Sequence, residues 1–360
     1  MSINKIKTTP GFCVLPFIEK HMPQDKTKQY YCCYNNGTAV KDRQKELTKI
    51  YAGEKIEHCT NCYNLEEQGS ISPRQIESFR WLKDPDVNRY INEWSINAQQ
   101  KIFFYDIRYN NKCNLACISC GPFSSSLWQK ELGIEILQEP IVDVSLNELL
   151  DSKKIYMAGG EPFIIDRFLE IIDSVSNSEN QPEVVINTNL TKINNTLIST
   201  LSKIKKLSLI ISVDSFERVN EYHRWPMSWQ KFLNNLNEIG KLKCYKSFNT
   251  VVDAVSILNI GNLIELENQI DEWNLSVLHT PVALRIENLP EPALSKARES
   301  VSQLVNSKFY KSSPVFKSRV NYILKQLENP ADSDKLINYI KTIDARRNIS
   351  HQDYLGVKIS

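Results

Sequence analysis

Three cysteines, Cys113, Cys117 and Cys120, stand close together in the spacing C-x3-C-x2-C. Thiolates at this spacing can wrap a cubane cluster on a short loop, and soft sulfur ligands suit iron–sulfur clusters. Such clusters normally take four protein ligands, so three thiolates leave one iron open, and an open coordination position can bind a substrate or cofactor. A structural zinc site completed by a remote ligand is the alternative for the same three thiols.

Polar residues follow the expected strands downstream of these cysteines. Residues 159–162, Gly-Gly-Glu-Pro, follow the second strand; residues 187–189, Asn-Thr-Asn, close the third; and residues 212–214, Ser-Val-Asp, close the fourth. Polar side chains at the C-terminal ends of barrel strands face the active site. Arg224 opens the next helical region and could form a forked pair with a carboxylate. Strand-end capping, or for Arg224 a surface position, is the alternative, and His223 is expected to be structural.

Taken together, these motifs resemble the radical SAM superfamily over residues 100–290. The resemblance implies that Cys113, Cys117 and Cys120 hold a [4Fe–4S] cluster whose open iron binds the amino and carboxylate groups of S-adenosylmethionine (SAM). It also implies that reduction of the cluster cleaves SAM, and that the resulting 5′-deoxyadenosyl radical abstracts a hydrogen from the substrate. The residues that it assigns to SAM are Gly159, Gly160, Glu161, Pro162, Asn189, Ser212, Asp214 and Arg224.

A second group of cysteines lies near the N-terminus. Cys59 and Cys62 form a C-x2-C pair, and Cys13 and the adjacent Cys32 and Cys33 lie upstream. Adjacent cysteines seldom both bind one metal, so we expect one of Cys32 and Cys33 to be a spare.

Residues 66–69 and 72–74, which follow Cys62, resemble the auxiliary-cluster modules of radical SAM enzymes, of the twitch or half-SPASM type. Those modules usually follow the barrel, whereas these residues precede it. The resemblance assigns a second [4Fe–4S] cluster to Cys13, Cys32, Cys59 and Cys62, for electron transfer or substrate anchoring. Structural zinc, which four thiolates also satisfy, stays the alternative, and the remaining Cys244 is expected to be a packed thiol.

Short apolar strands alternate with amphipathic helices from about residue 100 onward. Helical periodicity is clearest over residues 229–239 and 263–273, and another helical stretch is expected near Ile76–Ile91. This alternation predicts an α/β fold with a parallel sheet, and six strands fit an open, partial (βα)6 TIM-like barrel better than a closed one. The expected strands are 102–109, 154–158, 184–189, 207–214, 247–255 and 282–288. The predicted domains are a cysteine-rich auxiliary-cluster domain (1–98), the radical SAM barrel (99–290) and a C-terminal helical extension (291–360).

Composition sets limits on partners and location. The 360 residues are 41% hydrophobic and 24% charged, with a net charge of +2, so nothing indicates nucleic acid or an anionic membrane as a partner. No apolar run is long enough to span a bilayer, and the polar N-terminus lacks a signal-peptide core. A cytoplasmic protein is therefore expected, and in that reducing compartment closely spaced cysteines indicate metal binding or catalysis.

The sequence thus predicts a radical SAM enzyme that takes a hydrogen from a peptide or small-molecule substrate. Its expected partners are SAM, that substrate and an external electron donor such as flavodoxin or ferredoxin. Two alternatives stay open: a tRNA- or nucleotide-modifying radical SAM enzyme, and a zinc-binding adaptor on a degenerate barrel.

Overall fold

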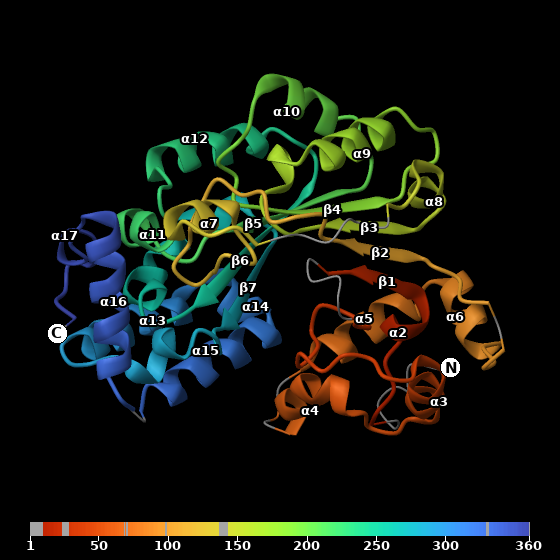
Figure 1. The fold of residues 1–360 in the computed structure, drawn as a ribbon, viewed down its shortest axis with the longest axis horizontal. Coiled ribbons are helices and arrows are strands. Elements are labelled where there is room, and N and C mark those ends of the chain that lie inside the picture. Colours follow the sequence, from red (N-terminus) through yellow and green to blue (C-terminus); the bar gives the residue numbers. More distant parts are fainter. Residues whose placement is uncertain are drawn as a thin grey trace. The chain divides into compact units, whose positions relative to one another are not determined.

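The computed structural model describes residues 10–23, 29–67, 69, 71–97, 99–136, 143–328 and 331–359. Its strands pair in chain order from β1 to β7, in parallel wherever the register is defined (Figure 1). The order ends at β1 and β7 without closing among the described residues, which confirms an open α/β sheet. The strands are β1 (Glu19–Met22), β2 (Phe104–Ile107), β3 (Lys154–Met157), β4 (Glu183–Thr188), β5 (Leu207–Ser212), β6 (Tyr245–Val252) and β7 (Glu272–Val277).

Contacts divide the chain into two compact units. Unit 1 contains residues 1–110, 137–159 and 177–184, and unit 2 contains residues 111–136, 160–176 and 185–360. Strands β1 to β3 belong to unit 1, β5 to β7 belong to unit 2, and β4 begins in unit 1 and continues into unit 2. Since each unit collects separate stretches of chain, the domain boundaries at residues 98 and 290 stay predictions.

Unit 1 is built on an aromatic core. Phe17, 1% exposed, lies edge-on to the rings of Tyr51 and Trp94, with centroids 6.0 and 5.0 Å apart. The helical stretch expected near 76–91 is two helices, because Asp84 caps a new helix and Pro85 occupies its first turn. The helices are α2 (Leu15–Ile18), α3 (Arg43–Ala52), α4 (Thr60–Glu67), α5 (Pro73–Trp81), α6 (Pro85–Asn92) and α8 (Leu146–Leu150).

Unit 2 packs helices around β5, β6 and β7. The apolar face expected over residues 229–239 is that of α12, where Trp229, Phe232, Leu236 and Ile239 are buried. Helices α9 and α10 lie side by side (Figure 1). The helices are α7 (Ser126–Leu132), α9 (Asp166–Ser176), α10 (Asn195–Leu201), α11 (Glu217–His223), α12 (Trp229–Gly240), α13 (Ala293–Gln303), α14 (Lys308–Ser312), α15 (Pro314–Gln326), α16 (Asp334–Arg347) and α17 (Gln352–Leu355).

Five of the six expected strands form, and the sixth prediction is wrong. Residues 282–288 form two short 3-10 turns, Val282–Leu284 and Ile286–Asn288, and the strand after β6 is instead β7. Trp273 fits the helical spacing expected over 263–273, but the 3-10 helix there ends at Gln269 and Trp273 is buried within β7. Strand β1 was not expected, because it has only four residues and begins Glu-Lys-His.

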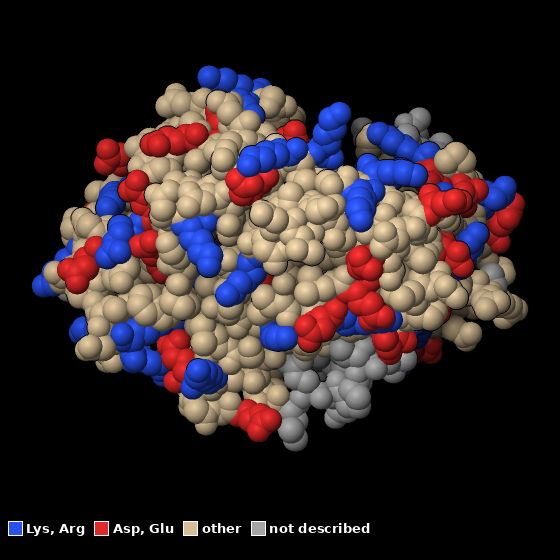
Figure 2. All heavy atoms as spheres, turned by 90° about the horizontal axis from the view of Figure 1, so that it is seen from above, with Lys and Arg blue, Asp and Glu red and all other residues tan. Residues whose placement is uncertain are grey.

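None of the described helices has the length and apolar character needed to cross a bilayer. On the face drawn in Figure 2, basic and acidic side chains are interspersed, in keeping with the net charge of +2. Residues 1–9, on which the expectation about a signal peptide depends, lie outside the described residues.

Candidate functional site

The loop that carries Cys113, Cys117 and Cys120 (the cysteine loop, residues 111–125) is held in unit 2 through its backbone. The Ala116 amide donates to the Trp225 carbonyl at 2.6 Å, and the Ile118 amide donates to the His223 carbonyl at 2.8 Å. Two alternate loop amides are therefore paired with the C-terminal end of α11 and the residues after it, which fixes the loop between its first and third cysteines.

Helix α7 holds the same loop from the other side. The indole Nε1 of Trp128 donates to the Cys117 carbonyl at 2.8 Å, and the Ser125 hydroxyl donates to the Leu115 carbonyl at 2.5 Å. The Cys113 amide donates to Ser126 Oγ at 3.1 Å. These bonds satisfy backbone groups that a loop cannot pair within itself.

Helix α16, far along the sequence, supplies two further bonds to this loop. The Tyr339 hydroxyl donates to the Ile118 carbonyl at 2.7 Å, and Arg347 Nη2 donates to the Ala116 carbonyl at 2.6 Å. The Arg347 side chain is 1% exposed and its Nε pairs with Glu131 at 3.0 Å. The C-terminal helices therefore support the cysteine loop, a role that their apolar periodicity alone did not predict.

Gly160 lies directly against the cysteine loop. A Cβ at this position would be 2.1 Å from the Lys112 carbonyl oxygen and 2.8 Å from the Asn111 carbonyl carbon. The next residue, Glu161, donates its amide to the same Lys112 carbonyl at 2.8 Å. Only glycine allows this approach, so the Gly-Gly-Glu-Pro segment positions the loop that precedes it by one βα unit. Gly159, the other glycine of the pair, has φ +123° and belongs to unit 1.

The Glu161 carboxylate is fully buried and already bonded within the protein. Its Oε1 accepts from the Thr188 hydroxyl at 2.6 Å and from the Phe163 amide at 3.2 Å, and its Oε2 accepts from the Asn189 amide at 2.7 Å. Burial raises the pKa of Glu161 to about 7, although the bonds from Thr188 and Asn189 act to lower it. The predicted contact of this carboxylate with SAM would therefore have to share oxygens that now bind Thr188, Phe163 and Asn189.

Asn189 connects the end of β4 to the cysteine loop. Its side-chain amide donates to Asn114 Oδ1 at 3.2 Å and lies 3.9 Å from Cys113 Sγ. Its Oδ1 accepts from the Thr191 hydroxyl at 2.6 Å, and Thr191 in turn accepts from Asn114 Nδ2 at 2.7 Å. Asn189 thus touches the first predicted cluster ligand.

Arg224 forms an ion pair inside the protein. Its Nη1 donates to Asp214 Oδ2 at 2.6 Å, and Asp214 Oδ1 accepts from the Val251 amide at 2.8 Å. Burial alone would raise the pKa of Asp214, but the Arg224 guanidinium and His223 hold it well below its usual range. Asp214 therefore orients Arg224. Ser212, the other residue predicted beside it, donates its hydroxyl to Asn187 Oδ1 at 3.0 Å.

His223 is fully buried between two aspartates. Its Nδ1 lies 3.0 Å from Asp214 Oδ2, and its Nε2 lies 2.5 Å from Asp253 Oδ2. Burial opposes the charged imidazolium, but Asp253 and Asp214 together raise the pKa of His223 to about 10. Sequence reasoning missed Asp253, although it follows the end of β6 as Asn189 and Asp214 follow β4 and β5.

The three thiols of the loop differ in protonation. The hydrogen bond between Cys117 and Cys120 lowers the pKa of Cys117 to about 6, with Arg224 acting in the same direction, and raises the pKa of Cys120. Burial raises the pKa of Cys113 to about 12, and the Cys117 thiolate adds to the shift. The loop thus presents one thiolate and two thiols that a bound metal would have to deprotonate.

The surroundings of these sulfurs suit an anionic group. Among the described residues, Arg224 Nε is a buried donor without a hydrogen-bond partner, and the sulfurs of Cys117 and Cys120 are close enough to influence the guanidinium. A buried unpaired donor is costly unless a ligand accepts from it. Three thiols beside this donor fit an iron–sulfur cluster with an acidic ligand.

Part of the chain is similar to a known protein family. Residues 107–263 match the family model described as the radical SAM superfamily. The region that contains the cysteine loop is thus similar to that family. No curated protein matches the sequence.

Two solved structures with bound SAM are similar to the chain at low identity. SuiB of Streptococcus suis bound to S-adenosylmethionine is 13% identical over 75% of this chain and 65% of its own, with a TM-score of 0.43. The structure described as native anSMEcpe with bound AdoMet is 14% identical over 64% of this chain and 62% of its own, with a TM-score of 0.39. The chain thus spans less than two thirds of either protein.

Within unit 2, the structure brings most of the predicted residues into one network. Gly160, Glu161, Asn189, Asp214 and Arg224 all connect to the cysteine loop, directly or through one neighbour. Ser212 contacts the end of β4 instead, and Pro162 begins a 3-10 turn in which Glu161 caps the Phe163 amide.

In unit 1, four cysteines are buried together. Cys13, Cys32, Cys59 and Cys62 are each no more than 8% exposed, whereas Cys33 is exposed. Burial raises the pKa of the Cys13 thiol, and the thiols of Cys59 and Cys62 are close enough to raise it further. Burial, and then Glu19, raise the pKa of the Cys32 thiol most, and Cys33, Cys13 and Cys59 raise it further. Burial distinguishes Cys32, which is buried like Cys13, Cys59 and Cys62 (together the four-thiol set), from the exposed Cys33.

The residues after Cys62 surround its sulfur. The Arg74 amide donates to the Cys62 sulfur and acts to lower its pKa, against burial, which raises it. Arg74 is 4% exposed, and its Nη2 pairs with Glu66 at 2.5 Å. Donors aimed at sulfur stabilise a metal-bound thiolate. Gln68 of the same motif lies outside the described residues.

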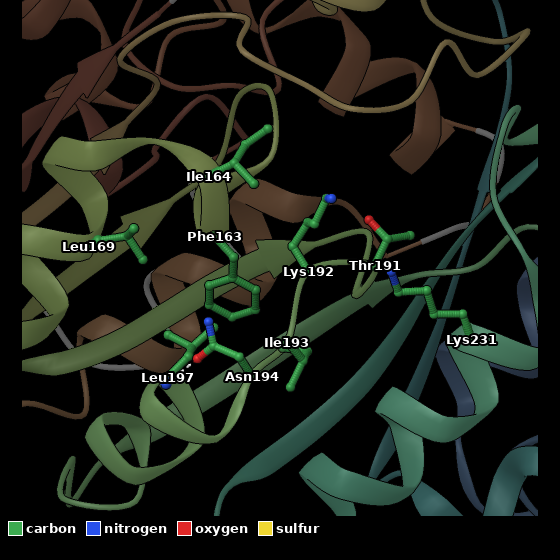
Figure 3. A pocket seen from close by; sticks show the side chains of 9 residues that line it. All are labelled: Phe163, Ile164, Leu169, Thr191, Lys192, Ile193, Asn194, Leu197 and Lys231. Carbon is green, nitrogen blue, oxygen red and sulfur yellow. Dashed lines mark hydrogen bonds between the residues drawn. The ribbon is translucent and has the colours of Figure 1, made fainter.

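A surface pocket of about 250 Å³ lies elsewhere in unit 2. Residues 191–197, Lys231 of α12 and the segment after Pro162 line it, and Figure 3 shows the Phe163 ring beside Asn194 and Leu197. None of the residues predicted to contact SAM lines this pocket.

Replacing Arg347 by lysine is expected to weaken the support of the cysteine loop. Lysine lacks the forked guanidinium that binds the Glu131 carboxylate and the Ala116 carbonyl at the same time. A buried carbonyl left unpaired costs about 1–3 kcal/mol. We expect a lower thermal midpoint and faster loss of loop iron to a chelator, measured anaerobically. Arg346→Lys, at the exposed neighbouring position, is the control; equal loss in both variants would contradict the role of Arg347.

Proposed function

We propose that the chain is a radical SAM enzyme, in which Cys113, Cys117 and Cys120 hold a [4Fe–4S] cluster and SAM binds at its open iron. The observation that carries the proposal is the buried, unpartnered Nε of Arg224 beside the cysteine thiols. When bound, the cluster would supply the electron for SAM cleavage, which yields the 5′-deoxyadenosyl radical that abstracts a hydrogen from the substrate.

The residues of the chain hold the cysteine loop in place and orient the groups that would bind SAM. Asp214 fixes Arg224, whose remaining donors can bind an anionic group such as the SAM carboxylate. Asn189 places an amide beside Cys113, and Gly160 sets the loop against the end of the Gly-Gly-Glu-Pro segment. Pairing most backbone groups of the loop excludes water from them and keeps the sulfurs in place.

The test is anaerobic incubation with SAM and dithionite, followed by mass spectrometry for 5′-deoxyadenosine. We expect a brown protein that forms this product, and a Cys113→Ala, Cys117→Ala, Cys120→Ala variant that forms none. Product formation by the variant would refute the assignment. A colourless wild-type protein that holds only zinc would instead support an adaptor without chemistry.

The proposal includes a second [4Fe–4S] cluster on the four-thiol set, with a peptide or small molecule as substrate and flavodoxin or ferredoxin as the electron donor. Four buried thiols and the donors around Cys62 support the cluster. It would accept an electron from the substrate radical or anchor the substrate. Incubation with deuterated candidate substrates would reveal the hydrogen that is taken.

Iron counts test which of the adjacent cysteines is a ligand. In the variant that lacks the three loop cysteines, about four irons per chain should remain. Adding Cys32→Ser should remove them, because Cys32 is buried as the other three thiols are, whereas Cys33→Ser should leave the count unchanged, because Cys33 is exposed. Loss of iron with Cys33→Ser and not with Cys32→Ser would reverse the assignment.

A further inference from the structure

Unit 1 contains a buried group of one imidazole and two carboxylates outside the four-thiol set. Glu19 and His21 come from β1 and Asp106 comes from β2. The parallel register places His21 opposite Asp106, and Glu19, two residues before His21, lies on the same face of the sheet. The three side chains are 1%, 3% and 2% exposed, respectively.

The donor atoms of these side chains converge. One atom from each lies within 4.8 Å of the other two; His21 Nδ1 is 3.0 Å from Asp106 Oδ2 and 3.9 Å from Glu19 Oε1. Ligands of a four-coordinate zinc ion, bound at about 2.0–2.2 Å, lie roughly 3.3–3.6 Å apart. Small side-chain shifts would therefore complete the geometry.

Glu19 supplies an independent sign that a ligand is missing. Its Oε2 is buried and has no hydrogen-bond partner among the described residues. Arg108 Nε lies 3.3 Å from Asp106 Oδ1 and its Nη2 donates to Asp106 Oδ2 at 3.5 Å, so Arg108 compensates this carboxylate, whose Oδ2 also lies 3.0 Å from His21 Nδ1. A buried carboxylate oxygen without a partner is costly, and a cation among these three groups would supply one.

A thiol stands at the edge of the same group. The side chain of Cys33 is hydrogen-bonded to Asp106, and Glu19 is also close to it. The residue is exposed, unlike Cys32. Zinc accepts thiolate, imidazole and carboxylate ligands in one tetrahedral site, so Cys33 offers the fourth donor.

We propose that Glu19, His21 and Asp106 bind a zinc ion, with the Cys33 thiolate as the fourth ligand. Binding releases the thiol proton, because the thiolate is the ligand form. The ion would link the short edge strand β1 to β2. The adjacent cysteines Cys32 and Cys33 would then serve two metal sites, iron and zinc.

The test counts zinc and iron by mass spectrometry in the anaerobically purified full chain, and then titrates it with zinc alone. We expect about one zinc per chain. In Glu19→Gln and in Cys33→Ser, the affinity for zinc should be at least about 100-fold weaker, which is a larger loss than the removal of a group that only orients a ligand would cause. Cys32→Ser is the matched control, with its iron lowered and its zinc unchanged.

The outcomes separate this site from its rivals. Zinc that disappears with Cys32→Ser but persists with Glu19→Gln would place the ion in the four-thiol set and overturn the proposal. A wild-type chain that neither holds nor binds zinc would also overturn it, leaving an ion-pair network. Since Glu19→Gln could reduce folding instead, each variant is also tested for reductive SAM cleavage by unit 2. A variant that loses zinc but still cleaves SAM supports the site. If Glu19→Gln and Cys33→Ser both keep their zinc, the proposal is refuted.

Discussion

Replacing Gly160 by alanine is expected to remove the iron of the cysteine loop and to lower SAM cleavage by at least about 100-fold, the effect of a misplacement near 1 Å. The added Cβ would be 2.1 Å from the Lys112 carbonyl oxygen, and its next neighbours are also backbone atoms of residues 111 and 112. Backbone cannot rotate away as a flexible side chain can. The loop must therefore move, and the bond from the Glu161 amide to Lys112 must lengthen.

The same loop offers a matched control. Gly121 directly follows Cys120, and a Cβ there would meet nothing within 4 Å. Gly121→Ala should therefore keep both its iron and its activity. Iron per chain and 5′-deoxyadenosine formation would be measured for both variants, with circular dichroism to confirm folding. Full iron content in Gly160→Ala would show that the loop does not depend on this contact.

Gly160 also shows how much of the site could be predicted from the sequence. The Gly-Gly-Glu-Pro motif placed Gly160 among the residues expected at the site, and the structure shows that its close neighbour is the cysteine loop. The strands that end at Thr188 and Ser212 could be predicted from continuous apolar runs, and so could the polar residues after them. The contacts among those residues could not, because they depend on neighbours 25 to 28 positions away.

Long-range partners were the part that sequence pattern could not supply. In the sequence, Arg347 and Tyr339 fit the polar side of an ordinary amphipathic helix, yet they donate hydrogen bonds to loop carbonyls that are 231 and 221 residues away. Strand β1 was missed because its charged residues lack the apolar pattern of a strand, and those same residues form the Glu19, His21 and Asp106 group. In both places, tertiary contacts decide the role of residues that look solvent-exposed in the sequence.

Replacing Asp253 by asparagine is expected to cost about 3–5 kcal/mol of stability, the usual effect of removing one partner of a buried ion pair. His223 is fully buried, and its Nε2 would lose the carboxylate 2.5 Å away while its positive charge remained beside Asp214 alone. Since the His223 carbonyl accepts from the Ile118 amide, the cysteine loop should loosen as well. Anaerobic thermal unfolding and iron content measure the two effects. Asp332→Asn, which removes a half-exposed pair with Lys335 at 3.7 Å, should change stability by less than about 1 kcal/mol.

The pH dependence of unfolding tests whether the charge of His223 causes the loss of stability expected in Asp253→Asn. Its pKa is raised to about 10 in the folded chain, against about 6.5 when unfolded. The ion-pair contribution is therefore fully present below pH 6.5 and is lost as the pH rises through 10. The wild-type chain should lose stability across this interval, and Asp253→Asn, with one carboxylate fewer to hold the proton, should lose less. Parallel stability curves for the two proteins would mean that His223 is neutral in the fold, and that Asp253 acts only through its bonds to the Val255 and Ser256 amides.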